Sequence, residues 1–295
     1  MKNENVKRGI ALILVSSFGF ALMGMFVRAA GDIPFMQKTL FRNTTAFFIA
    51  LSILLHMRKK DRNALCIPKG ALTYLILRSI VGSIGIFGNF YAIDHLNISD
   101  AAMLNKMSPF FSLLASFLFL SEKPSVCSII SLITAFSGAL FIIKPSFEFT
   151  KVLPALVGFA GGAGAGFAYA FVRKLHTYNI NGFLIITFFS AFSSLLSLPF
   201  FFLNYTPMTS RQVLFLCCAG ISAAIGQFGI TGAYFNAPSS KISIYEYSQI
   251  LFSALLGFVA FAQIPDILSI IGYVIIIGTA IIVFVYNTTS SRQKA

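Results

Sequence analysis

The fold of this chain follows from two stretches of sequence, IGIFGNFYA at residues 84–92 and IGQFGITGA at residues 225–233. They share five residues at matching positions, so that Ile225 of the second stretch corresponds to Ile84 of the first. The match continues without a gap, and residues 84–142 align with residues 225–283 at 15 identities in 59 positions. Shared composition alone would give about five identities over such a length. The sequence therefore predicts an internal repeat.

The composition is that of a membrane protein. Apolar residues make up 57% of the chain and charged residues 11%, with a mean hydropathy of +0.84. A soluble domain carries about 25% charged residues, so a water-soluble fold is excluded. The net charge of +13 raises the question of nucleic-acid binding. The basic residues lie between apolar runs, as in membrane proteins, and we therefore expect no nucleic-acid partner.

Ten apolar segments are long enough to cross the bilayer, since a helix needs about 20 apolar residues to span it. We read the first segment as a retained helix rather than a signal peptide, because it is too long for a signal sequence and more segments follow. Prolines fall in or beside the connectors, where helices end. The expected spans are residues 9–30, 35–57, 70–93, 101–120, 125–143, 153–172, 182–203, 212–235, 242–263 and 266–286.

The basic residues of the connectors predict the orientation. With the N-terminus inside, 14 Lys and Arg lie on the cytoplasmic side and five on the other. Such an excess is typical of cytoplasmic loops, so both termini are expected in the cytoplasm, on the inner face of a cytoplasmic membrane. The repeat divides the chain into five-helix units at residues 1–147 and 148–295. An odd number of spans places the second unit upside down relative to the first, as in secondary transporters that work by alternating access.

Two segments carry a family resemblance. They are the paired stretches SPFFSLLASFLFLSE at residues 108–122 and QILFSALLGFVAFAQ at residues 249–263. With the basic N-terminus and the two five-helix halves, they resemble an EamA-type transporter of the drug/metabolite transporter superfamily. The resemblance implies a ten-helix carrier of small metabolites. In the second copy Ile250 and Gln263 replace Pro109 and Glu122, so the two copies need not play the same role.

Four ionisable residues lie inside the expected spans, namely Arg42, Arg78, Lys106 and Glu246. A charge at the bilayer centre costs about 2.5 to 3.5 kcal/mol, so each of them is a functional hypothesis. Counting about 1.5 Å of rise per residue puts Arg78 and Glu246 in the cytoplasmic half and Arg42 and Lys106 in the outer half. We therefore expect an Arg78–Glu246 pair, acting either as a structural or gating ion pair or as part of the solute site. Lys106 and Glu246 are expected to lie far apart.

Arg42 and Lys106 have no acidic residue at their expected depth. Two cations without an acidic partner would suit a carboxylate or phosphate on the solute. The alternative is that they reach the interface or pair with backbone carbonyls, and Lys106 is the better candidate for this.

Uncharged polar and aromatic residues extend the predicted solute site. In the third span Arg78, Gly82, Gly85 and Asn89 share one stripe, and in the eighth span Gly220, Ala223, Gln227, Thr231 and Tyr234 do the same. These stripes could line a cavity, or their small residues could pack helices closely. Tyr245 to Tyr247 are expected to open the ninth helix, with Tyr91 and Tyr169 as further aromatic walls. The predicted substrate-binding residues are Arg42, Arg78, Asn89, Tyr91, Lys106, Tyr169, Gln227, Tyr234, Glu246 and Tyr247.

The sequence favours a secondary active transporter of a small anionic or zwitterionic, amino-acid-like metabolite, with proton coupling through Glu246 as a further hypothesis. The alternatives are an exporter of lipophilic cations, a membrane-embedded enzyme and a channel. The acidic and His residues are scattered near connectors, so that no enzyme, metal or cofactor site is expected. The expected partners are the solute, the bilayer and protons, and the chain could act as a monomer or a homodimer.

Overall fold

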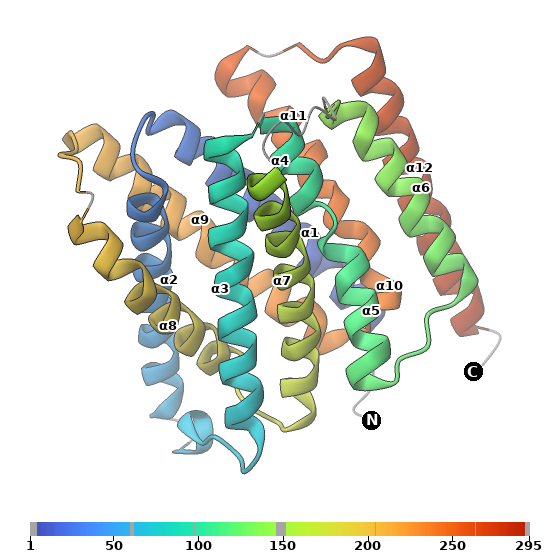
Figure 1. Ribbon diagram of the computed structural model, residues 1–295. Helices are drawn as coiled ribbons and strands as arrows, with labels where there is room; N and C mark the ends of the chain where they lie inside the picture. The colour runs from blue at the N-terminus through green and yellow to red at the C-terminus, as the bar shows by residue number, and fades with distance from the viewer. Residues whose placement is uncertain are drawn as a thin grey trace.

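The computed structural model describes residues 5–59, 62–96, 98–145, 152–203, 205–262 and 264–292. Every regular element within these ranges is a helix (Figure 1). The helices are α1 (Val6–Ala29), α2 (Phe35–Arg58), η1 (Arg62–Leu65), α3 (Ala71–His95), α4 (Ile98–Asn105), α5 (Ser108–Leu120), α6 (Val126–Ile143), α7 (Val152–Thr177), α8 (Gly182–Leu203), α9 (Ser210–Asn236), α10 (Ser239–Ile242), η2 (Ser243–Tyr247), α11 (Ser248–Phe261) and α12 (Ile267–Arg292).

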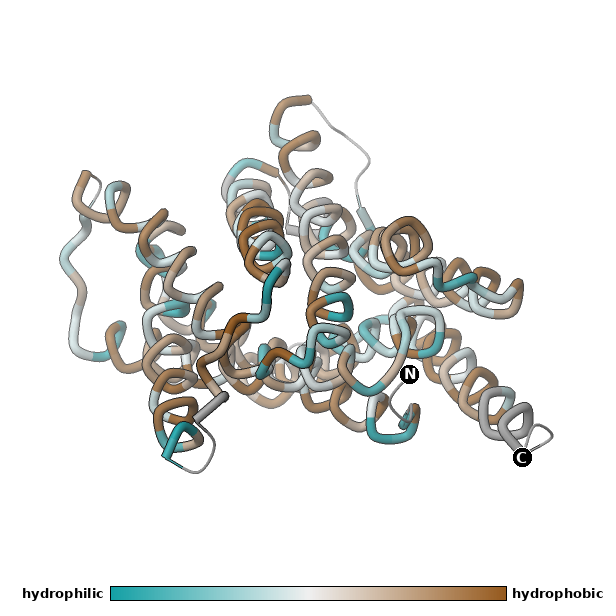
Figure 2. The backbone as a smooth tube through the Cα atoms, turned by 90° about the horizontal axis from the view of Figure 1, so that it is seen from below, coloured by the Kyte–Doolittle hydropathy of each residue, from teal (hydrophilic) through white to brown (hydrophobic). Residues whose placement is uncertain are grey.

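Ten helical spans of the described chain are long and apolar enough to cross a membrane, as the hydropathy predicted. The fourth span combines α4 and α5, and the ninth combines α10, η2 and α11. Large apolar side chains face outward, with Val126 72% and Val259 73% exposed, and Figure 2 shows hydrophobic residues on helices all around the bundle. Such a surface is stable only against lipid, so the chain is a multi-pass membrane protein.

Both chain termini lie at the same end of the bundle, the lower end in Figure 1. We call this the terminal end and the other the opposite end. Because α3 leaves the terminal end, its later residues lie nearer the opposite end, whereas α7 and α9 finish at the terminal end.

The helix boundaries repeat with the same shift that relates the two copies in the sequence. α3 and α9 end at equivalent positions, α4 and α10 begin at equivalent positions, and so do α6 and α12. The residues that follow α5 and α11, Ser121 and Ala262, both adopt the left-handed conformation, with φ of 55° and 51°. The repeat therefore extends from the sequence to the backbone.

The helix contacts also occur in matched pairs. α1, the first helix of the first half, packs on α9, and α7, the first helix of the second half, packs on α3. In the same way α5 packs on α7 and α11 on α1, while α2 meets α8 and α6 meets α12. Exchanging the halves leaves this pattern unchanged, as expected of two inverted repeats. The predicted boundary at residues 147 and 148 lies outside the described residues and stays a prediction.

Glycines allow the backbones of these matched helix pairs to pack in direct contact. A Cβ added to Gly88 of α3 would lie 2.6 Å from the Val157 carbonyl oxygen and 2.8 Å from the Cα of Gly161 in α7. At the equivalent place, a Cβ on Gly229 of α9 would lie 2.7 Å from the Leu12 carbonyl oxygen in α1. At these positions the small residues serve close helix packing.

The fourth and ninth spans are both interrupted near their middle. In the fourth span Pro109 lies in the first turn of α5 and has no N–H to continue the hydrogen-bond ladder. The ninth span has Ile250 at the equivalent position, and there the short 3₁₀ helix η2 joins α10 to α11, with the Ser248 hydroxyl donating to the Tyr245 carbonyl at 2.6 Å. The prediction that residues 245–247 open the ninth helix is wrong, because the span already begins at Ser239.

Candidate functional site

A cavity of about 120 Å³ lies between the two halves, from the centre of the bundle toward the opposite end. This is room for several water molecules, each of which needs about 10–15 Å³ by the same measure. Helices α1, α2, α3, α4, α7, α8, α9 and α11 contribute to its wall. Five of the ten predicted solute-binding residues line it, namely Arg42, Arg78, Asn89, Tyr169 and Gln227.

The cavity lies where the repeats meet. Ile86 and Gln227 occupy equivalent positions in the two halves, and both line it. The shift that relates Phe26 to Phe171 likewise pairs two lining residues of α1 with two of α7, Phe20 with Ala165 and Met23 with Ala168. Repeat-related positions of both halves therefore face the same cavity.

Arg42 is a buried cation with no acidic partner among the described residues. It is 6% exposed, and its Nε has no hydrogen-bond partner. α8 holds this stretch of α2 in place through the next residue, Asn43, whose amide donates to the Ser193 hydroxyl at 2.8 Å. Because a buried N–H of a charged group costs free energy when unpaired, the arrangement favours an anionic group in the cavity.

Arg78 lies deeper, at 1% exposure. Its Nη2 donates to Oε1 of Gln227 at 3.2 Å, and its guanidinium lies 3.5 Å from the ring centre of Phe189, while Nε and Nη1 have no hydrogen-bond partner. Gly82 leaves the space for this arrangement, since a Cβ there would lie 2.8 Å from Nη1. Two buried guanidinium groups with unpaired donors therefore border the same cavity.

The predicted Arg78–Glu246 ion pair is not formed. Glu246 is 7% exposed and accepts a hydrogen bond from the Tyr234 hydroxyl at 2.6 Å, and that hydroxyl also lies 3.0 Å from the Ser112 hydroxyl. Glu246 and Tyr234 therefore face each other on the terminal side of the cavity, and neither is among the residues that line it.

Lys106 lies beside the Glu246 segment, contrary to the prediction that the two are far apart. The Lys106 Nζ donates a hydrogen bond to Oε1 of Gln249 at 2.7 Å, and the Tyr247 hydroxyl donates one to the Lys106 carbonyl oxygen at 3.2 Å. The ammonium group of Lys106 also interacts electrostatically with the Glu246 carboxylate. The depth estimate was wrong because the two spans begin earlier than expected, which moves both residues toward the centre. At 8% exposure Lys106 does not reach the interface.

The predicted tyrosines occupy different places. Tyr169 lines the cavity and stacks on Tyr234, with ring centres 5.4 Å apart. Tyr247 is fully buried at the break of the ninth span. Tyr91 stacks on His95, the last residue of α3, with ring centres 4.0 Å apart, and does not line the cavity.

Nine of the lining residues were not predicted from the sequence, among them the polar Asn105 and Gln249 and the ring of Phe189. Asn105 ends α4, and Gln249 is the second residue of α11, so both lie beside the two helix breaks. The repeat offered a signal for Asn105, because its equivalent in the second half is Glu246. The N-termini of α5 and α11 carry partial positive charge, which adds to that of the arginines.

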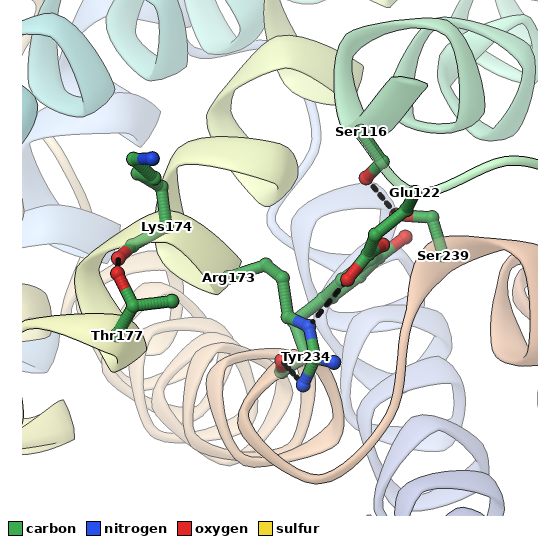
Figure 3. A network of polar contacts seen from close by, with 7 residues as sticks. All are labelled: Ser116, Glu122, Arg173, Lys174, Thr177, Tyr234 and Ser239. Atoms are coloured by element: carbon green, nitrogen blue, oxygen red, sulfur yellow. Dashed lines mark hydrogen bonds and ion pairs between the residues drawn. The ribbon is translucent and has the colours of Figure 1, made fainter. Parts of the chain in front are cut away.

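A second polar cluster lies closer to the terminal end, where α5, α7 and α9 meet (Figure 3). Arg173 Nε lies 2.9 Å from Oε1 of Glu122, and Nη1 lies 3.5 Å from the Tyr234 carbonyl oxygen. Nearby, the hydroxyls of Ser116 and Ser239 lie 2.7 Å apart. The pair of Glu122 and Arg173 was not predicted from the sequence. Together these contacts join the halves on the terminal side of the cavity.

Breaking the Glu122–Arg173 pair is expected to destabilise the fold. The two side chains are 19% and 11% exposed, so Glu122→Gln should lower the free energy of unfolding by about 1 to 3 kcal/mol. A double-mutant cycle with Arg173→Gln, in which melting temperatures are measured in detergent, isolates the interaction energy between Glu122 and Arg173. Additive losses would show that the pair contributes nothing of its own.

The part of the chain that the structure describes contains no group of three His, Cys, Asp or Glu side chains able to hold a metal ion. The chemistry of the described cavity is instead that of guanidinium and amide donors with aromatic walls. Such a set binds and orients a small polar solute.

Part of this chain is similar in sequence to a known protein family. Residues 7–144 match the EamA-like transporter family. The first half of this chain belongs to the EamA-like transporter family. The resemblance to the drug/metabolite transporter superfamily is thus confirmed.

Named transporters of other organisms align with most of this chain. The pseudopaline exporter CntI of Pseudomonas aeruginosa is 29% identical over 94% of this chain and 95% of its own. The riboflavin transporter of Vibrio cholerae is 24% identical over 97% of this chain and 96% of its own. Human solute carrier family 35 member G1 is 23% identical over 87% of this chain and 73% of its own.

One crystal structure superposes on this protein with a TM-score of 0.82, covering 97% of this chain and 99% of its own at 14% identity. At that identity the likeness shows the shared fold alone. The family match and the named relatives point to membrane transport rather than to enzyme activity.

Proposed function

We propose that this protein is a secondary active transporter of a small anionic or zwitterionic metabolite, amino-acid-like in size and charge. It acts in the cytoplasmic membrane with both termini inside, and it works by alternating access between two inverted five-helix halves. One observation carries the solute class. Two buried arginines, Arg42 and Arg78, border the central cavity with unpaired N–H groups and no acidic residue among the described residues that line it.

The matched helix boundaries and contacts support the inverted arrangement. The relatives support transport and differ in the solute that their names state, pseudopaline in one case and riboflavin in another. Solute class therefore has to come from the cavity itself, where a carboxylate would satisfy the free donors of both guanidinium groups.

A lipophilic-cation exporter is the second candidate, and the surroundings of Glu246 argue against it. The carboxylate is hydrogen-bonded by Tyr234 and lies beside Lys106 instead of facing the cavity. A cation entering the described cavity would meet two arginines and no acid. An enzyme would need acid–base or metal chemistry for which the cavity has no groups.

Uptake by the purified protein in liposomes tests the proposal. Labelled amino acids and small carboxylic acids are compared with a lipophilic cation such as tetraphenylphosphonium, with membrane potential and pH gradient imposed separately. We expect saturable uptake of acids. A preference for the cation would refute the solute class, and uptake that never saturates would indicate a channel.

Proton coupling is expected to depend on Glu246. The titratable residues that interact with its carboxylate are Lys106, Tyr169, Tyr234 and Tyr247. Glu246→Gln removes the ionisable group but keeps an acceptor for Tyr234, so solute exchange should continue while pH-driven accumulation falls to the level without a gradient. Accumulation that keeps its pH dependence in Glu246→Gln would remove Glu246 from the coupling mechanism.

A further inference from the structure

A second cavity, of about 470 Å³, lies at the terminal end. It is bordered by the first turns of α1, the end of α2, the connector between α7 and α8, the start of α8 and the last turns of α9. The proposed function uses only the first cavity and leaves this one without a role.

The two cavities follow one another along the same pair of helices. On α8, Phe189 lines the first cavity and Ile186, one turn earlier, lines the second. On α9, Gln227 lines the first cavity and Thr231, one turn later, lines the second. Arg78 contacts Phe189 and Gln227, so its guanidinium lies at the boundary between the cavities.

Thr231 is a polar group left without a partner inside the second cavity. It is 2% exposed, and its Oγ1 makes no hydrogen bond, although the residue lines a space of several hundred cubic ångströms. A buried hydroxyl is normally hydrogen-bonded, to protein or to a bound molecule. Its repeat equivalent is Phe90, which lines the first cavity, so the two positions face corresponding spaces.

The charged residues that line this cavity indicate which class of ligand it binds. Arg8, an exposed residue of the first turn of α1, is part of its wall, and none of the described residues that line it is acidic. The rest of the wall includes aliphatic side chains, aromatic rings such as Phe228 and Phe235, asparagine side chains and the imidazole of His176. A cationic mouth over a partly apolar interior attracts small anions and repels cations.

We propose that this cavity is a second anion-binding site, on the terminal side of the transport path, that holds the carried solute one helical turn from the Arg42–Arg78 site. Arg8 draws the anion in, and Thr231 donates a hydrogen bond to it. Arg78, which lines the first cavity, lies between the two sites. This inference rests on the proposed function for the identity of the solute, but the anion preference of the cavity can be measured without it.

The experiment uses charged thiol reagents in place of the solute. Thr231→Cys is placed in a protein in which Cys66, Cys127, Cys217 and Cys218 are replaced by alanine, in oriented proteoliposomes. Sulfonatoethyl methanethiosulfonate, an anion, and trimethylammonioethyl methanethiosulfonate, a cation, are added at the terminal end, and each rate is divided by the rate with a free thiol. Asn236→Cys, also in the cavity wall, serves as a second reporter if Thr231→Cys fails to fold.

We expect the anion to react about fivefold faster than the cation on the normalised scale, because a unit charge several ångströms away attracts one reagent and repels the other. Arg8→Gln should remove the preference, whereas Arg58→Gln, at the same end but outside the cavity wall, should keep it. A cysteine that the terminal-side reagents do not reach, or a ratio equal to that of the free thiol, would overturn the proposal.

Anionic lipid could supply the same chemistry, so a further arm uses uncharged N-ethylmaleimide in vesicles with and without phosphatidylglycerol. Equal labelling rates are expected of a solute site. Slower labelling with phosphatidylglycerol would assign the cavity to a lipid and overturn the proposal. Neither result depends on the Arg42 site, so failure of this inference and failure of the proposed function are separate outcomes.

Discussion

Replacing Arg42 by glutamine is expected to lower the affinity for an anionic solute by about tenfold to a hundredfold. A hydrogen bond between charged groups contributes about 1.5–3 kcal/mol, and 1.4 kcal/mol corresponds to a factor of ten. The loss should appear in the KM for uptake or in the Kd for binding, since Arg42 is expected to hold the solute at the cavity wall. Arg78→Gln should have an effect of similar size.

Stability separates this binding role from a structural one. Arg42 is buried, and its Nε has no hydrogen-bond partner, so its removal should leave the melting temperature of the solute-free protein unchanged or raise it. Arg211→Gln is the matched control, because Arg211 is an exposed arginine of α9 that lies over Phe215 and outside the cavity. If Arg42→Gln loses stability but transports with normal KM, Arg42 is a structural residue.

The second large effect is expected at the contact between α3 and α7. Gly88→Leu would force a side chain into the backbone of α7, where even a Cβ would lie 2.6 Å from the Val157 carbonyl oxygen. Overpacking a tight contact costs about 1–3 kcal/mol or more, and here backbone must move. We expect Gly88→Leu to abolish recovery of monodisperse protein, as measured by size-exclusion chromatography in detergent.

Gly278→Leu provides the control, because a Cβ on Gly278 of α12 meets no atom within 4 Å. It should behave as the parent protein does. Gly229→Leu, at the equivalent of Gly88 in the second half, should fail as Gly88→Leu does. Normal behaviour of both Gly88→Leu and Gly229→Leu would show that the first helix of each half does not pack on the third helix of the other half as closely as described.

The ten spans could be predicted from sequence because a helix in lipid must satisfy its own backbone and carry apolar side chains. The interruption of the fourth span had a signal in Pro109. That of the ninth span had none, because Ile250 stands where the first copy has proline. Because α4 and the ninth span both begin three residues earlier than expected, Lys106 and Glu246 lie deeper than the depth estimate put them, and this error produced the wrong statement that the two lie far apart.

The candidate site was partly predictable for a similar reason. Arg42, Arg78, Asn89 and Gln227 stand out as polar residues within apolar spans. Their partners do not, because a contact between two helices depends on how each is rotated about its axis, which hydropathy leaves open. Phe189, on which Arg78 lies, is one of 34 phenylalanines and carries no distinguishing pattern.

The central claim is that two inverted halves expose one cavity to each side of the membrane in turn. A single cysteine at Ile86, whose repeat equivalent Gln227 lines the same cavity, tests it most directly. In the cysteine-free protein in oriented proteoliposomes, a membrane-impermeant thiol reagent should modify Ile86→Cys from either face, and a transported solute should slow both reactions. Modification from one face only, under every solute and pH gradient applied, would contradict the account.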